Sequence, residues 1–184
     1  MDYLSGANNN FTGNIPSFIC ALCTLTILDL SNNQFNGSIP RCMGNFSSTL
    51  RTLNLRKNRL SGDLPENISA SIKSLDIGHN QLVGKLPRSL VHISFLEVFN
   101  VESNIINDTF PFWLSSLQEL QVLVLRSNAF HGQIGQARFS KLRIIDISSN
   151  HFNGTLPSDC FENWTAMLSL GKKEDQFNGE YMGT

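Results

Sequence analysis

A template of 22 to 25 residues recurs seven times in this 184-residue chain and limits the fold more than any other feature. Its fixed point is an asparagine, at Asn9, Asn33, Asn58, Asn80, Asn104, Asn128 and Asn150. Each asparagine is followed by an apolar residue at +2, a glycine at +4 (except Asp108) and a proline at +7 (except Gly135). From the second copy onward, apolar residues also stand three, five and eight positions before the asparagine. Regular spacing of this length is typical of a solenoid.

Each template position has a physical role. Apolar residues at alternate positions predict a short strand, and strands of successive coils would stack about 4.8 Å apart in a buried parallel sheet. The asparagine would turn inward and satisfy backbone groups of adjoining coils. The glycine would permit a tight reversal, and the proline would end the strand. We therefore predict an α/β-type repeat solenoid of about seven coils over residues 1–157, with a short parallel sheet on its concave face.

Residues 158–184 fit the template poorly. Trp164, Met167, Leu168 and Leu170 are expected to pack as a partial coil on the last full repeat. The polar residues that follow are expected to be loosely ordered.

The template resembles the leucine-rich repeat, and its Leu-x-Gly-x-Ile-Pro ending is similar to that of the plant extracellular subclass. Residues 33–40 and 150–157 match this ending closely. Residues 107–114 (Asn-Asp-Thr-Phe-Pro-Phe-Trp-Leu) and 163–167 (Asn-Trp-Thr-Ala-Met) resemble sequences of plant receptor-like proteins, which are surface receptors without a kinase domain. In that family the second stretch precedes a non-repeat island, so 158–184 would include its start. The family's signal peptide, caps, membrane helix and cytoplasmic tail are not recognised here, so we expect an interior or truncated ectodomain segment.

Composition argues against several classes of function. A net charge of −1 provides no attraction to nucleic acid, and the absence of any run of 18 apolar residues argues against membrane insertion by this chain itself. No kinase glycine loop, Gly-x-Ser-x-Gly or His-Glu-x-x-His motif occurs, and the four histidines lack ligand spacing. We therefore expect no enzyme activity, no metal and no cofactor.

Two cysteines are spaced by about one repeat. Cys20 and Cys42 lie 22 residues apart, so adjacent coils can bring them within disulfide distance, and a similar pair recurs in the receptor-like proteins. The alternative is two reduced cysteines packed as small apolar residues. The Cys20-Ala-Leu-Cys23 stretch also reads as a redox motif, but it lies in a solenoid connection rather than at the start of a helix.

Seven sequons for N-linked glycosylation occur, which is an excess for this composition. They begin at Asn10, Asn36, Asn45, Asn67, Asn107, Asn153 and Asn163. Part of the excess is inherent in the repeat, where Asn-Gly-Ser and Asn-Gly-Thr suit the turn. Because none falls at an outward position of a predicted strand, glycans would coat the convex and lateral surfaces and leave the concave sheet bare. This placement favours a secreted, ligand-binding protein.

Charged residues gather at the outward strand positions of the third to sixth coils. The candidate ligand-binding residues are Arg51, Arg56, Lys57, Lys73, His79, Glu97, Glu102 and Arg126. The basic members would dock an acidic peptide or protein, including a free carboxylate; the alternative is a solvated sheet face without a specific role. Ile27, Val98, Val122 and Ile144 form an aliphatic column, interpreted as β-branched packing along the sheet or as an apolar strip for a ligand.

The resemblance implies recognition of an extracellular peptide or protein at the outer face of the plasma membrane, with defence or developmental signalling through a co-receptor kinase. Two alternatives stay open. One is a truncated fragment that is inactive or acts as a decoy. The other is a secreted inhibitor similar to the polygalacturonase-inhibiting proteins, which share this repeat subclass.

Overall fold

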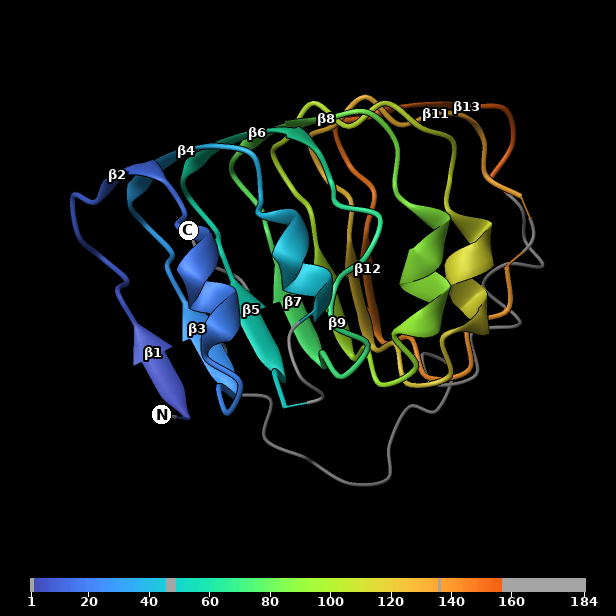
Figure 1. Ribbon diagram of the computed structural model, residues 1–184. Coiled ribbons are helices and arrows are strands. Elements are labelled where there is room, and N and C mark those ends of the chain that lie inside the picture. The colour runs from blue at the N-terminus through green and yellow to red at the C-terminus, as the bar shows by residue number, and fades with distance from the viewer. Residues whose placement is uncertain (1, 46–48, 136, 157–184) are drawn as a thin grey trace.

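The computed structural model describes residues 2–45, 49–135 and 137–156, and these form stacked coils of a solenoid (Figure 1). We number the coils by the template asparagines, so that coil 1 contains Asn9 and coil 7 contains Asn150. One short strand per coil builds a parallel seven-stranded sheet in the order β1-β3-β5-β7-β9-β10-β12. These strands are β1 (Tyr3–Ser5), β3 (Ile27–Asp29), β5 (Thr52–Asn54), β7 (Ser74–Asp76), β9 (Val98–Asn100), β10 (Val122–Val124) and β12 (Ile144–Asp146). The predicted concave parallel sheet is confirmed.

The template residues before each asparagine form the core, as predicted. The middle residue of each strand points inward, and from coil 2 to coil 6 it is at most 1% exposed (Leu28, Leu53, Leu75, Phe99, Leu123). The apolar residues two positions after the asparagines continue the core in a second row, with stacked phenylalanine rings at both ends. Fully burying one such side chain is worth about 1.5–3 kcal/mol, so the buried members of these rows provide most of the stability of the coils.

A second set of short parallel strands, which the sequence analysis did not predict, follows the template asparagines along one edge of the solenoid (Figure 1). Four strands pair in the order β2 (Thr12–Asn14), β4 (Gln34–Gly37), β6 (Arg59–Asp63), β8 (Gln81–Val83), and β11 (His131–Gln133) pairs with β13 (His151–Asn153). The template glycine lies within or just after such a strand, with φ between 71° and 82°. It therefore shapes a second strand rather than closing a simple reversal.

The second sheet is interrupted at coil 5. There Asp108 replaces the template glycine, and it does not adopt the positive φ of the six glycines. For a residue with a Cβ, that backbone conformation is sterically unfavourable and costs free energy. In place of a strand, coil 5 contributes an isolated bridge between Thr109 and His131. This gap divides the second sheet into its two parts.

Four short 3₁₀ helices follow the prolines and cover the side opposite the main sheet. They are η1 (Ser17–Ala21), η2 (Arg41–Asn45), η3 (Arg88–His92) and η4 (Phe112–Ser116). Proline precedes each one, where its fixed φ suits the start of a helix and its missing N–H costs no hydrogen bond. The predicted partial coil in 158–184, with Trp164, Met167, Leu168 and Leu170, lies outside the described residues.

Candidate functional site

The template asparagines form a ladder between coils, as predicted. The Nδ2 of Asn104 donates to the carbonyl oxygens of Ile77 in the coil before and of Val101 and Glu102 in its own coil, at 3.0–3.2 Å. Its Oδ1 accepts the N–H of Leu82, also in the coil before, at 3.0 Å. The same pattern recurs at Asn58, Asn80, Asn128 and Asn150. This ladder fixes the spacing of the concave strands on which any ligand would rest.

A second column of polar side chains, missed in the sequence analysis, caps the concave strands. The third residue of β3, β5, β7, β9 and β12 is Asp or Asn, and its Oδ1 accepts the N–H two residues later at 2.9–3.1 Å: Asp29, Asn54, Asp76, Asn100, Asp146. In coil 1 the Ser5 hydroxyl takes this role. The signal was present in the sequence, four positions before six of the seven template asparagines. In these six coils the residue that follows the bonded N–H has a φ of 52–57°, and the bond supports this turn.

The sequence-predicted charges do not form one free basic cluster. Arg56 of coil 3 forms an ion pair with Glu102 of coil 5, reaching across coil 4, and lies 3.7 Å from Asp76. His79 Nε2 is 3.4 Å from the same Glu102 oxygen. The structure therefore brings Arg56, His79 and Glu102 together, and an acidic partner would compete with Glu102 for this arginine.

Gly78 makes the contact between alternate coils possible. A Cβ built on Gly78 would lie 3.2 Å from an Arg56 guanidinium nitrogen and 3.1 Å from Glu102 Cγ. Even an alanine at this position of coil 4 would require the two side chains to shift by a few tenths of an ångström.

The other predicted residues lie apart from that group. Lys73 Nζ contacts Glu97 Oε1 at 2.7 Å just before the strands, and the neighbouring Arg51 donates to the Ser71 carbonyl oxygen at 3.0 Å. Lys57 is exposed and has a φ of 54°. Arg126 is also exposed, on coil 6, and among the described residues no carboxylate lies within ion-pair distance of it.

Burial raises the pKa of Asp76 above the ordinary value of 3.8, and Glu102 adds to the rise, whereas the Gly78 N–H, Arg56 and Asn100 oppose it. A raised native pKa means that this carboxyl contributes most to stability below its ordinary pKa, and that the contribution declines as pH rises through the native pKa.

We expect Asp76→Asn to gain stability relative to the parent chain as pH rises from acid toward neutral, because asparagine already fills this position at Asn54 and Asn100. Urea unfolding of both proteins between acid and neutral pH measures the difference. A difference that stays constant or shrinks with rising pH would contradict the expectation.

The predicted disulfide is confirmed. Cys20 of η1 is bonded to Cys42 of η2, with their Cα atoms 6.0 Å apart, so Cys20 is not paired with Cys23 of the apparent redox motif. The bond joins coils 1 and 2 on the helical side, away from the concave sheet.

Replacing both Cys20 and Cys42 by alanine should lower the free energy of unfolding by about 2–3 kcal/mol, because the unfolded chain regains the conformational freedom that the bond removes. The expected loss is moderate because the closed loop is short. Urea unfolding of secreted protein measures this loss. The matched control is Cys23→Ala, which keeps the bond and should leave stability nearly unchanged. Equal effects of the two changes would refute the stabilising role of the bond.

The sequons that the structure describes lie off the main sheet. Asn10, Asn36, Asn67, Asn107 and Asn153 are all exposed. Asn36 and Asn153 do lie in strands, β4 and β13, but these belong to the second sheet. The side chain of Asn45 and the whole of Asn163 lie outside the described residues.

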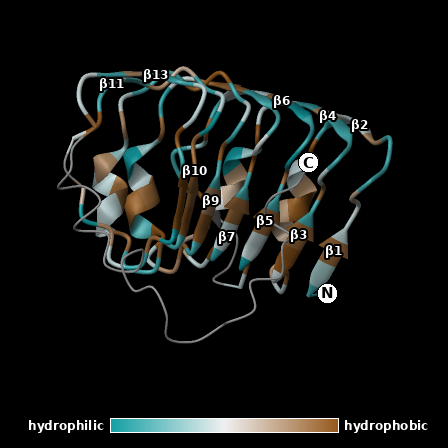
Figure 2. Ribbon diagram, turned by 180° about the vertical axis from the view of Figure 1, so that it is seen from behind, coloured by the Kyte–Doolittle hydropathy of each residue, from teal (hydrophilic) through white to brown (hydrophobic). Residues whose placement is uncertain are grey.

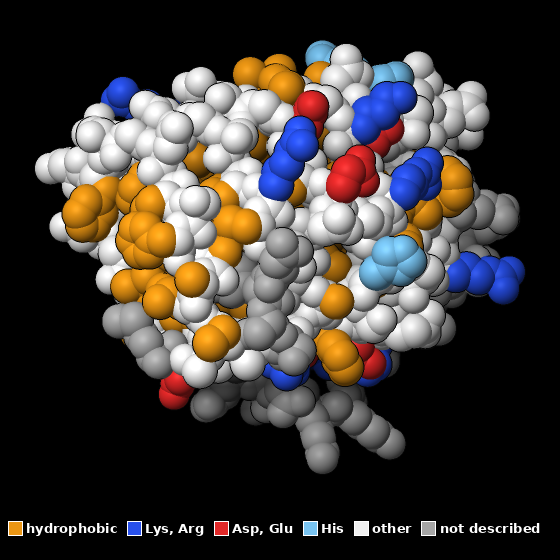
Figure 3. Space-filling view, viewed as in Figure 1, with side chains coloured by type: hydrophobic (Ala, Val, Ile, Leu, Met, Phe, Trp, Pro, Cys, Tyr) orange, Lys and Arg blue, Asp and Glu red, His pale blue; other side chains and the backbone are white. Residues whose placement is uncertain are grey.

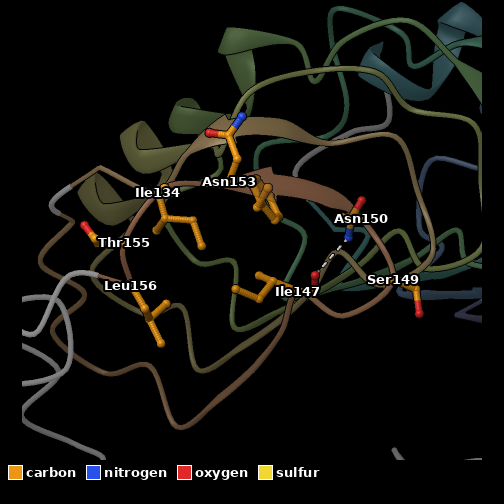
Figure 4. Close-up of a pocket in the computed structure, with 9 residues that line it drawn as sticks. Ile134, Ile147, Ser149, Asn150, Asn153, Thr155 and Leu156 are labelled. Atoms are coloured by element: carbon orange, nitrogen blue, oxygen red, sulfur yellow. Dashed lines mark hydrogen bonds between the residues drawn. The ribbon is translucent and has the colours of Figure 1, made fainter.

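Two pockets formed by the described residues lie away from the concave strands. One of about 320 Å³ is lined by inward positions of the last coils, including Ile134, Ile147 and Leu156 (Figure 4). In the earlier coils the same positions are covered by the following coil. This pocket therefore marks the end of the described core. Another, of about 580 Å³, is lined by the polar side chains Asp63, Glu66, Lys85, Arg88, Asp108 and His131.

Figure 3 shows hydrophobic side chains near the first coils and charged and histidine side chains toward the last ones.

At the side of the second pocket, the Arg88 guanidinium lies 4.8 Å from the centre of the Trp113 ring and 5.9 Å from that of Phe112. This is a cation–π contact between coils 4 and 5. Arg88 therefore packs on the motif residues 107–114 that carried the sequence resemblance.

Among the described residues no helix has the length and apolar character needed to cross a membrane. The described part of the chain also contains no group of three or more His, Cys, Asp or Glu side chains placed to hold a metal ion.

The chain matches the Leucine Rich Repeat family model at residues 24–46, 49–70, 71–93 and 141–163. Receptor-like protein 35 of Arabidopsis thaliana is 68% identical over all 184 residues, which are 20% of that protein. Receptor-like protein 33 of the same plant is 70% identical, again over the whole chain and 21% of its own length. The chain thus spans about a fifth of the length of these relatives.

Solved structures of plant receptors share the fold. The peptide hormone receptor RGFR1 in complex with RGF2 superposes with a TM-score of 0.83 at 29% identity, over 87% of this chain and 26% of that one. The PEPR1–AtPEP1 complex gives 0.82 at 32% identity, over 91% and 24%. A TDR receptor gives 0.80 at 35% identity, over 87% and 28%. The chain is therefore a leucine-rich-repeat solenoid homologous to a segment of the plant receptor-like proteins.

Proposed function

We propose that this chain is a ligand-recognition segment that binds an extracellular peptide or protein along its concave sheet. The observation that carries the proposal is its similarity to two solved receptors, RGFR1 and PEPR1, whose structures were determined with RGF2 and AtPEP1. The exposed sequons support the same surface, because glycans at these positions would leave the concave strands accessible. Recognition rather than catalysis is the role we assign.

By its homology to receptor-like proteins, we place the chain on the outer face of the plasma membrane. Signalling would then depend on a separate co-receptor kinase.

A displayed library of short random peptides tests the binding surface. Selected peptides should lose binding to a concave variant carrying Thr52→Arg and Ser74→Arg, because these residues point outward from β5 and β7. The matched control carries Ser17→Arg and Ala21→Arg, two exposed positions of η1 away from the main sheet. Selected peptides that bind the concave variant as well as they bind the parent would overturn the proposal.

Glycosylation gives an independent test of the compartment. We expect the protein, produced through a plant secretory pathway, to lose mass on enzymatic deglycosylation. A variant with Asn36, Asn107 and Asn153 all changed to glutamine should lose less mass, because it lacks three exposed acceptors. Intact-mass spectrometry reads both results, and secreted protein without any mass change would contradict the extracellular assignment.

A further inference from the structure

The column of side chains that caps the concave strands is broken once, in coil 6. Six coils place a Ser, Asp or Asn at this position, and each side chain accepts the N–H two residues later. Coil 6 has Val124 instead, which has no acceptor. In the described part of the chain, no acceptor contacts the backbone N–H of Arg126, which is therefore an open donor at the concave face.

The surroundings of this donor are apolar on one side and cationic on the other. Val122 is only 4% exposed, and it pairs in register with Val98 in β9 and with Ile144 in β12, which is 40% exposed. Figure 2 shows β9 and β10 as hydrophobic strands. The Arg126 side chain is exposed and lacks the carboxylate partner that Arg56 has.

The acidic groups on the two sides of coil 6 do not pair with Arg126. Asp146, the next member of the column, accepts both the N–H and the hydroxyl of Ser148 through Oδ1. Glu102, on the other side, is paired with Arg56 and His79. Arg126 is thus the charge most available to a ligand at this part of the sheet.

We propose that the coil-six niche, formed by Val122, Val124, Arg126 and Ile144, anchors an acidic side chain of a peptide ligand that has an aliphatic neighbour. One carboxylate oxygen would accept the Arg126 N–H and the other would face the guanidinium, while the aliphatic residue packs on Val124 and Ile144, the more exposed apolar members of the niche. This assignment rests on the proposed function and specifies the ligand chemistry at one place on the same sheet.

A carboxylate suits this donor pair because hydrogen bonds to an ionised acceptor are about twice as strong as neutral ones. The apolar side of the niche favours a peptide over an acidic sugar, whose hydroxyl groups would be left without partners against valine and isoleucine. An aliphatic side chain there removes apolar surface from water instead.

The test titrates the ¹⁵N-labelled chain with N-acetyl-valyl-glutamyl-amide and with its glutamine counterpart, and follows the Arg126 amide signal by NMR. The glutamate peptide should move this signal downfield, and the glutamine peptide should bind about tenfold more weakly or worse.

Four variants separate the contributions. Val124→Asn supplies the side-chain acceptor found in the other coils, so it should occupy the Arg126 N–H and weaken glutamate binding about tenfold. Val124→Ala leaves the donor open and should lose less affinity. Arg126→Gln should weaken binding, whereas Lys57→Gln, which removes an exposed cation from coil 3, should not.

Several outcomes would overturn the assignment of the coil-six niche as a carboxylate site. These are equal binding by Val124→Asn and the parent, equal binding of the glutamate and glutamine peptides, or a stronger response to trigalacturonate than to the glutamate peptide. If the glutamate peptide binds nowhere while library-selected peptides still require the concave face, the niche assignment fails and the proposed function stands. If those selected peptides do not use the concave face either, the proposed function fails as well.

Discussion

Replacing Asn104 by alanine should destabilise the solenoid by about 2–4 kcal/mol, because the change removes four hydrogen bonds and leaves the buried N–H of Leu82 without its acceptor. The carbonyl oxygens of Ile77 and Val101 lose less, since Asn80 and Asn128 also donate to them. Urea unfolding followed by circular dichroism measures the loss.

Asn9 provides a matched control at the first coil. Its amide donates only to Gly6 and Ala7 of its own coil, and the residue is exposed. Asn9→Ala should therefore change the free energy of unfolding by no more than about 0.5 kcal/mol. If both alanine variants lost the same stability, the cost would come from the residue type and not from bridging between coils.

Replacing Phe99 by alanine should cost about 3–5 kcal/mol, the range for truncating a fully buried aromatic side chain. Phe99 stands in a row of leucines, at the inward position of β9, so the cavity would open in the middle of the stack. Phe99→Leu should cost considerably less, because leucine fills this position in five other coils. The midpoints of urea unfolding should decrease in the order parent, Phe99→Leu, Phe99→Ala.

Phe95 is the matched control for Phe99, because it lies in the same coil and is 55% exposed. Phe95→Ala leaves no buried cavity and should alter stability by about 0.5 kcal/mol or less. Comparable losses at the two positions would show that the stack of inward residues is not the main source of stability.

The main sheet, the inward rows and the asparagine ladder could be predicted because each follows from a residue type repeated at fixed spacing. The buried residues Leu28 and Leu30 alternate with outward ones, and the Asn33 amide turns inward to the Gly6 carbonyl oxygen of the coil before. The Cys20–Cys42 bond followed from the same spacing together with family resemblance. Repetition makes such predictions strong, because every copy tests the others.

The second sheet could not be predicted from apolar alternation, because β2 contains only Thr12, Gly13 and Asn14. Its strands arise from hydrogen bonds between neighbouring coils, such as the Gln34 N–H to the Phe11 carbonyl oxygen at 2.8 Å. These bonds depend on the spacing that the main sheet and core impose.

The charged site escaped prediction for a different reason. Column by column, Arg56 counts as a free cation, but its long side chain reaches Glu102 two coils away over the bare backbone of Gly78. Which charges pair therefore depends on side-chain reach and on a missing side chain between them. The open Arg126 donor was hidden in the same way, because it exists only as an exception to a column that had not been recognised.

The asparagine ladder has a direction. From Asn33 onward each template asparagine reaches back to the coil before it, as Asn58 does to Leu30 and Phe35, so a coil is closed by residues about one repeat further along the chain. A ribosome releases the chain from its N-terminus, and each newly released repeat thus completes the one already folded. The coils can lock in the order of their synthesis, so that only the newest one has unsatisfied backbone groups while the protein is being made.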